Sequence, residues 1–150
     1  MSERTRDDET ERTYRRTERN YRERGKWASA FVALLGLWLI VAALLFEMFA
    51  ANFWNHVIVG VLAIVLGGYN FMRRSNERYG SVAAAAFVAL LGLWLIVSPW
   101  LVDTDLAGTD VVTEIGFWNP IIVGVLMLLL GVYSAYEATE TGTPASAETR

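Results

Sequence analysis

Few residues in this 150-residue chain are suited to chemistry. The chain has no cysteine, which excludes disulfides, thiol redox chemistry and Cys-based metal or iron–sulfur sites. His56 is the one histidine, and a metal site needs three or four ligands. We therefore expect no metal site and no cofactor. We interpret His56 as an interfacial residue in the first turn of a helix, in preference to a ligand.

Two carboxylates form the other candidate chemistry. Glu47 and Asp103 are 56 residues apart, and each ends a long uncharged run. Carboxylates inside a membrane can relay protons, but a carboxylate at the outer edge is simply hydrated. The second interpretation is favoured because both residues lie at the edge of their runs. The sequence therefore predicts no catalytic residues, and we expect that the protein is not an enzyme.

Four uncharged runs must position these residues. Apolar residues make up 54% of the chain, and the mean hydropathy is +0.32. A helix needs about 20 residues to cross about 30 Å of hydrocarbon. Four runs with almost no polar face favour membrane spans over a buried helical core. The predicted fold is all-α, a polytopic membrane protein with four transmembrane helices at Trp27–Phe46, Met48–Met72, Tyr79–Val102 and Ile115–Tyr136.

An internal repeat organises the four runs. The segment FVALLGLWLIV occurs at 31–41 and again at 87–97, and FWNHVIVGVL at 53–62 returns as FWNPIIVGVL at 117–126. Each copy is a two-span hairpin, the first covering 27–72 and the second 79–136. Two spans return the chain to its starting side, so the copies have the same orientation and form a parallel repeat.

The distribution of positive charge predicts the orientation in the cell membrane. Nine of the 13 Lys and Arg residues precede Trp27, and three more lie in the short loop 73–78. Because bases gather in the cytoplasm, the head 1–26, this loop and the tail 137–150 are predicted to be cytoplasmic. The outer loops are then 47–53 and 103–114.

Both tails are predicted to be disordered, since residues 2–26 contain no Ala, Val, Ile, Leu, Met or Phe. The basic head is interpreted as an orientation signal, in preference to a patch that attracts anionic lipid. The formal net charge of −3 gives no case for nucleic-acid binding.

Small residues recur on one face of each span. In the first and third spans they fall at matching places of the repeat, three and four residues apart. In the second and fourth spans, two glycines lie seven residues apart, close to two helical turns. Because small residues let helices approach closely in lipid, we interpret these stripes as packing seams in preference to a ligand groove. The glycines concerned are Gly36, Gly92, Gly60, Gly67, Gly124 and Gly131.

Aromatic and amide residues mark the starts of the second and fourth spans. Asn119 and Pro120 have the chemistry of an N-cap and a first helical turn, and Asn55 is the matching residue in the first copy. Trp54 and Trp118 precede them as interfacial anchors. Two further tryptophans, Trp38 and Trp94, lie mid-span at equivalent positions, where helix packing is favoured over a pocket wall.

The tripeptide Ser98-Pro99-Trp100 ends the third span. Together with the two-span repeat and the Trp-Asn start of the next span, it resembles the SPW-repeat membrane proteins over residues 27–136. The first copy departs from this pattern, with Ala-Ala-Leu at 42–44. The resemblance implies a small integral membrane protein without an assigned activity and without catalytic residues.

The motif also has a structural interpretation. Pro99 removes a backbone hydrogen bond and so bends or ends the helix, and Ser98 can satisfy the freed carbonyl. Trp100 then anchors the helix at the outer interface. This interpretation is favoured over a binding site because each residue has a structural role.

The sequence favours a non-catalytic membrane protein that packs in the lipid bilayer with itself or with a membrane-protein partner. The alternative is a small-molecule transporter or channel that acts as an oligomer. In size the chain resembles the small multidrug-resistance exporters, which depend on an acidic residue within the first span. Here the interior of every predicted span is uncharged, so ion coupling has no evident carrier.

Overall fold

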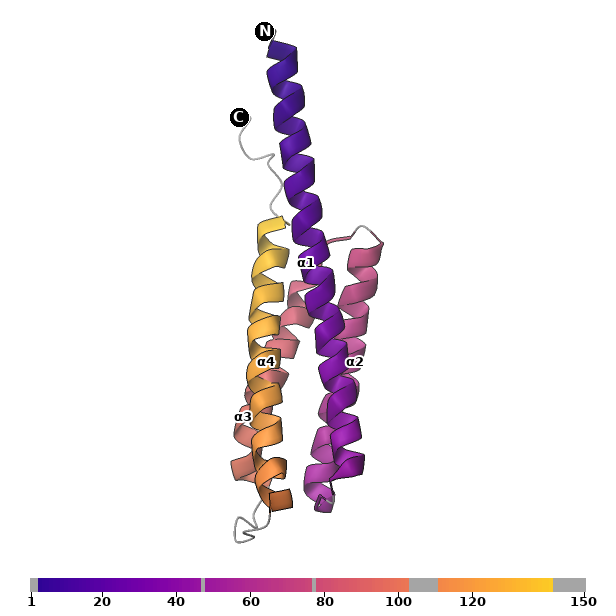
Figure 1. Ribbon diagram of the computed structural model, residues 1–150, viewed down its shortest axis with the longest axis vertical. Helices are drawn as coiled ribbons and strands as arrows, with labels where there is room; N and C mark the ends of the chain where they lie inside the picture. Colours follow the sequence, from indigo (N-terminus) through magenta and orange to yellow (C-terminus); the bar gives the residue numbers. More distant parts are fainter. Residues whose placement is uncertain (1–2, 47, 77, 103–110, 142–150) are drawn as a thin grey trace.

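A computed structural model describes residues 3–46, 48–76, 78–102 and 111–141. They form four helices that run up and down in one bundle (Figure 1). Each helix contains a segment long and apolar enough to cross a membrane. The predicted all-α fold with four membrane-spanning helices is therefore confirmed. The helices are α1 Glu3–Leu45, α2 Ala50–Ser75, α3 Val82–Val102 and α4 Val111–Thr141.

The two predicted hairpins are also present. The most extensive packing joins α1 to α2 and α3 to α4, while α2 with α3 and α1 with α4 share smaller interfaces. The four helices thus form a ring in chain order. The start of α1 and the end of α4 lie at the same end of the bundle (Figure 1). We call this the basic end, because it carries Lys26, Arg73 and Arg74, and we call the opposite end, with Ser98–Trp100, the SPW end.

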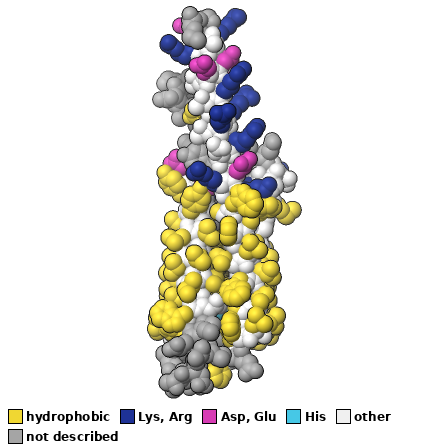
Figure 2. Space-filling model, viewed as in Figure 1, with side chains coloured by type: hydrophobic (Ala, Val, Ile, Leu, Met, Phe, Trp, Pro, Cys, Tyr) yellow, Lys and Arg dark blue, Asp and Glu magenta, His cyan; other side chains and the backbone are white. Residues whose placement is uncertain are grey.

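Both copies of the repeat contribute matching side chains to the core. Leu39 and its repeat equivalent Leu95 are fully buried. The outer surface is also apolar, with large hydrophobic side chains exposed along all four helices. Figure 2 shows this apolar surface over the bundle and the charged residues above it on α1. Such a surface is stable where lipid is the solvent. The core cluster comprises Val32, Leu39, Val59, Ala63, Val88, Leu95, Val123 and Met127.

The head differs from the disorder expected of it, because α1 is helical from Glu3. A helix is costly to start but cheap to extend, and the membrane span already supplies the nucleus. Local contacts add to it: Arg15 pairs with Glu11 one turn away at 3.9 Å, and Thr13 donates to the carbonyl of Glu9 at 2.8 Å. The head is therefore a charged helix that projects from the basic end.

The fourth helix exceeds its predicted span at both ends. It begins at Val111, inside the predicted outer loop, and ends at Thr141, inside the predicted tail. The remainder of that tail, like Glu47 and Asp103, lies outside the described residues.

Candidate functional site

Glycine contacts join the two helices within each hairpin. A Cβ added to Gly36 in α1 would lie 2.5 Å from the carbonyl oxygen of Gly60 in α2. A Cβ added to Gly92 in α3 would lie 2.6 Å from the carbonyl oxygen of Gly124 in α4. Real Cβ atoms essentially never approach another atom so closely. These four glycines therefore set the distance between the helices at the middle of each hairpin.

The same arrangement recurs one to two turns nearer the basic end. A Cβ on Gly67 would lie 2.8 Å from the backbone nitrogen of Ala33, and one on Gly131 would lie 2.5 Å from the backbone nitrogen of Ala89. The stripes thus face each other inside the hairpins, where small residues allow backbone contact.

Hydrogen bonds between side chains connect one hairpin to the other. The indole Nε1 of Trp38 in α1 donates to Oδ1 of Asn119 in α4 at 2.9 Å. The indole Nε1 of Trp94 in α3 donates to Oδ1 of Asn55 in α2 at 2.8 Å. The two bonds join equivalent positions of the repeat with the partners exchanged. The structure therefore brings the mid-span tryptophans to the Asn residues of the opposite hairpin.

The predicted helix-start motif lies inside the helices instead of at their starts. Asn55 is five residues beyond the start of α2, and Asn119 is eight residues beyond the start of α4. Pro120 is likewise inside α4. The two Asn side chains therefore accept indole hydrogen bonds where N-capping was expected. Trp54 and Trp118 are both more than half exposed on the outer surface.

His56 also differs from its interpretation as a first-turn interfacial residue. It lies on the second turn of α2 with its side chain fully buried. Its Nδ1 is 2.9 Å from the carbonyl oxygen of Asn52, and Nε2 is buried without a hydrogen-bond partner among the described residues. No cluster of three or more His, Asp or Glu side chains that could hold a metal occurs in the described parts of the chain.

The Ser98-Pro99-Trp100 motif lies within the last two turns of α3, which continues past Pro99 to Val102. A proline leaves free the carbonyl four residues before it, which here belongs to Leu95. The buried Ser98 hydroxyl donates to that carbonyl at 3.1 Å. Trp100 is 55% exposed and packs edge-on against the ring of Phe117. The serine thus replaces the hydrogen bond that the proline removes.

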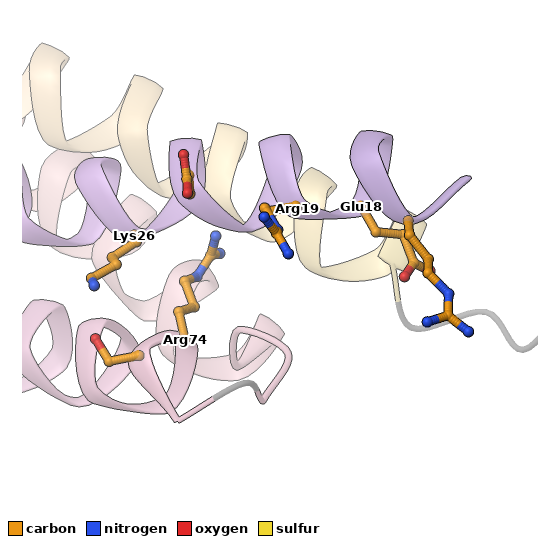
Figure 3. Close-up of a pocket in the computed structure, with 7 residues that line it drawn as sticks. Glu18, Arg19, Lys26 and Arg74 are labelled. Atoms are coloured by element: carbon orange, nitrogen blue, oxygen red, sulfur yellow. The ribbon is translucent and has the colours of Figure 1, made fainter. Parts of the chain in front are cut away.

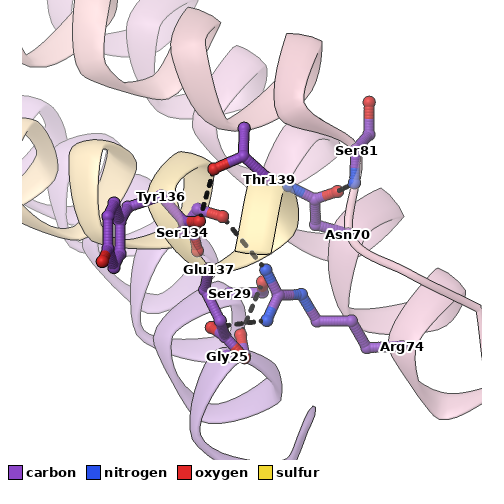
Figure 4. A network of polar contacts seen from close by, with 9 residues as sticks. All are labelled: Gly25, Ser29, Asn70, Arg74, Ser81, Ser134, Tyr136, Glu137 and Thr139. Carbon is purple, nitrogen blue, oxygen red and sulfur yellow. Dashed lines mark hydrogen bonds and ion pairs between the residues drawn. The ribbon is translucent and has the colours of Figure 1, made fainter. Parts of the chain in front are cut away.

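A buried ion pair closes the basic end (Figure 4). The Arg74 Nη1 of α2 donates to Oε2 of Glu137 in α4 at 2.9 Å, and the two side chains are 3% and 5% exposed. Arg74 Nη2 also donates to the carbonyl of Ser134 at 3.4 Å. This pair joins the two hairpins, as the Trp–Asn bonds do nearer the SPW end.

Two glycines make room for the guanidinium of Arg74. A Cβ on Gly25 in α1 would collide with Arg74 Nη1 and with Glu137 Oε2. A Cβ on Gly80, just before α3, would lie 2.5 Å from Arg74 Nη2. Arg74 is therefore enclosed by all the elements at this end of the bundle.

The sequence analysis did not identify this cluster. It placed Arg74 in a solvated loop and Glu137 in a disordered tail. The one signal available was the pair Gly25 and Gly80, each shortly before the first span of a hairpin. That signal does not by itself reveal an ion pair.

The interior between the four helices is almost filled. The cavity lined by Ser29, Asn70, Val88 and Ser134 has a volume of about 10 Å³. A cavity of this size holds at most about one water molecule. The polar contacts described above therefore hold the helices together, and they do not line a passage through the described part of the bundle.

Comparison with known proteins agrees with this architecture. The family model of the SPW repeat domain matches residues 26–134, which include both hairpins and the Ser98-Pro99-Trp100 motif. No curated protein and no solved structure matches the chain. The chain belongs to the SPW repeat domain family.

Proposed function

We propose that this protein is a non-catalytic integral membrane protein that acts by packing with itself or with another membrane protein. The observation that carries the proposal is the filled interior of the bundle, whose central cavity measures about 10 Å³. Backbone contacts at Gly36–Gly60 and Gly92–Gly124 leave no room for a solute between the helices of a hairpin. The broad apolar outer surface is then the part of the molecule available to partners.

Two measurements on the purified protein in lipid nanodiscs and liposomes test this proposal. Native mass spectrometry from nanodiscs is expected to show a defined homo-oligomer or a co-purifying membrane protein. Liposomes loaded with potassium or a small cationic dye are expected to leak at the rate of protein-free liposomes. Leakage that rises with the amount of protein would contradict the proposal and favour the transporter or channel alternative.

We further propose that the protein lies in the cell membrane with both ends of the described chain in the cytoplasm. The described bases gather at the basic end and on the projecting part of α1, in keeping with the excess of Lys and Arg in cytoplasmic loops. Because the chain has no cysteine, single Asn76→Cys and Gly108→Cys variants report on one position each. An impermeant maleimide is expected to label only Gly108→Cys in intact cells, and both after lysis. The reverse pattern would invert the orientation.

A further inference from the structure

Two grooves lie between α1 and α2, one above the other. The upper groove, at the basic end, has a volume of about 490 Å³ (Figure 3). Four bases and two acids line it together with Ser75, so its lining carries an excess of positive charge. The bases are Arg15, Arg19, Lys26 and Arg74, and the acids are Glu18 and Glu23. An anionic group with several oxygens is the ligand that such a lining would attract.

The lower groove is apolar and has a volume of about 450 Å³. It lies along the membrane-spanning parts of α1 and α2, with Leu34 and Leu37 on one side and Phe71 on the other. Gly68 forms part of its floor, and a Cβ added there would meet no atom within 4 Å. In a bilayer this groove has the length and chemistry to hold an acyl chain.

The two grooves meet at Lys26 and Phe71. The Lys26 ammonium lies 5.1 Å from the centre of the Phe71 ring, so a residue of the upper groove touches a residue of the lower one. On an α-helix, each residue is turned by about 100° from the one before. The α1 positions 15, 19, 26, 30, 33 and 37 therefore fall within about 60° of one another, and so do the α2 positions 64, 68, 71 and 75. A single face of each helix thus runs from the bases down to the apolar lining.

We propose that this α1–α2 groove binds one anionic phospholipid, with its phosphate at Lys26 and Arg19 and an acyl chain along Gly68. Lys26 precedes the interfacial Trp27, and Arg19 is about two turns, or about 10 Å, above it. Both bases therefore lie at the depth of lipid headgroups. Arg74 is held by Glu137 and forms a wall of the site, since its guanidinium reaches from α2 toward α1 (Figure 3). The lipid site is independent of whether the protein self-associates.

The second hairpin provides an internal comparison. In the register of the repeat, Val132 stands in the place of Gly68, and Val82 stands in the place of Lys26. The second hairpin thus has neither the open floor nor the base. The proposal therefore assigns a single lipid to each chain, on the first hairpin.

The test uses the full chain in nanodiscs that contain equal amounts of phosphatidylglycerol and phosphatidylcholine with identical acyl chains. Native mass spectrometry then counts the lipids that remain bound. Wild-type protein is expected to retain one phosphatidylglycerol. Arg19→Gln with Lys26→Gln should weaken its binding about 30-fold, since each base near a membrane surface contributes roughly fivefold. Gly68→Val, the residue that the second hairpin carries, should abolish retention by filling the floor.

Matched controls separate the groove from general effects. Arg4→Gln with Arg6→Gln removes two charges from the projecting end of α1, and Ala86→Val adds bulk to the exposed surface of the second hairpin. Both control proteins are expected to retain the lipid. Equal retention in all five proteins, or equal retention of both lipids by the wild type, would overturn the proposal. A rise in melting temperature with inorganic phosphate equal to that with phosphatidylglycerol would overturn it too, because the acyl chain would then contribute nothing.

Discussion

Trp38 in α1 and Asn119 in α4 share a hydrogen bond that crosses from one hairpin to the other at 2.9 Å. The equivalent Trp94 in α3 makes the reciprocal bond to Asn55 in α2. The same chemistry thus joins the hairpins twice, at positions related by the repeat. An indole N–H has no water to bond within a bilayer, so an acceptor on the neighbouring hairpin favours this one pairing of the hairpins.

A double-mutant cycle should detect this crossed pairing. Trp38→Phe and Asn119→Leu are expected to couple by about 0.6 kcal/mol, the average for hydrogen bonds between membrane helices. Trp38→Phe and Asn55→Leu should be additive, because Trp38 bonds the other asparagine. Unfolding free energies in detergent measure both cycles. Coupling of Trp38 to Asn55 in place of Asn119 would show that the pairing is not crossed.

Two adjacent glycines should respond to alanine in opposite ways. Gly67→Ala is expected to destabilise the bundle by about 1–3 kcal/mol, since the new Cβ would lie 2.8 Å from backbone atoms of α1. Gly68→Ala should be neutral or stabilising by up to about 1 kcal/mol, because the site is open and alanine favours the helix. Melting temperatures of the two variants form a matched comparison. Similar values would place Gly67 on the lipid-facing surface.

The seams also predict a ranking of larger substitutions. Gly92→Leu and Gly124→Leu should lower the melting temperature more than Val97→Leu, because bulk at a close contact separates the helices. Val97 is 40% exposed on the surface of α3, where an added methylene meets lipid. Equal melting temperatures for the three variants would contradict the packing role of Gly92 and Gly124.

Removal of one partner of the buried ion pair should be costly. Arg74→Met leaves the Glu137 carboxylate without its partner at a nearly fully buried position, so we expect a loss of about 3–5 kcal/mol. Arg74→Met with Glu137→Leu should recover most of that loss, since no charge is then left unpaired. Unfolding in detergent compares the two. A double variant no more stable than the single one would show that the pair itself stabilises the basic end.

The serine of the SPW motif should matter only while the proline is present. Ser98→Ala removes the hydroxyl that donates to the Leu95 carbonyl, which should destabilise α3 by about 1–3 kcal/mol. Pro99→Ala should be tolerated, because the restored backbone N–H can reach the same carbonyl. In the Pro99→Ala background, Ser98→Ala should therefore have little effect. An equal effect of Ser98→Ala in both backgrounds would exclude this compensation.

The sequence by itself determined the four spans, the two parallel hairpins and the glycine stripes. Each of these depends on local properties, namely the length of an uncharged run, the recurrence of identical segments and the 3.6-residue period of a helix. The compensation at Ser98 and Pro99 was also accessible, because it acts over a single turn of α3.

Only the tertiary structure decided which residues meet across the hairpins. The bond between Trp38 and Asn119 depends on the ring order of the helices and on their vertical register, and neither follows from a local period. The burial of Arg74 against Glu137 has the same origin, since two residues that each look solvated become buried when α2 and α4 close the basic end. Helix α1 likewise continues into the charged head because the folded span supplies its nucleus, a contribution that composition alone does not reveal.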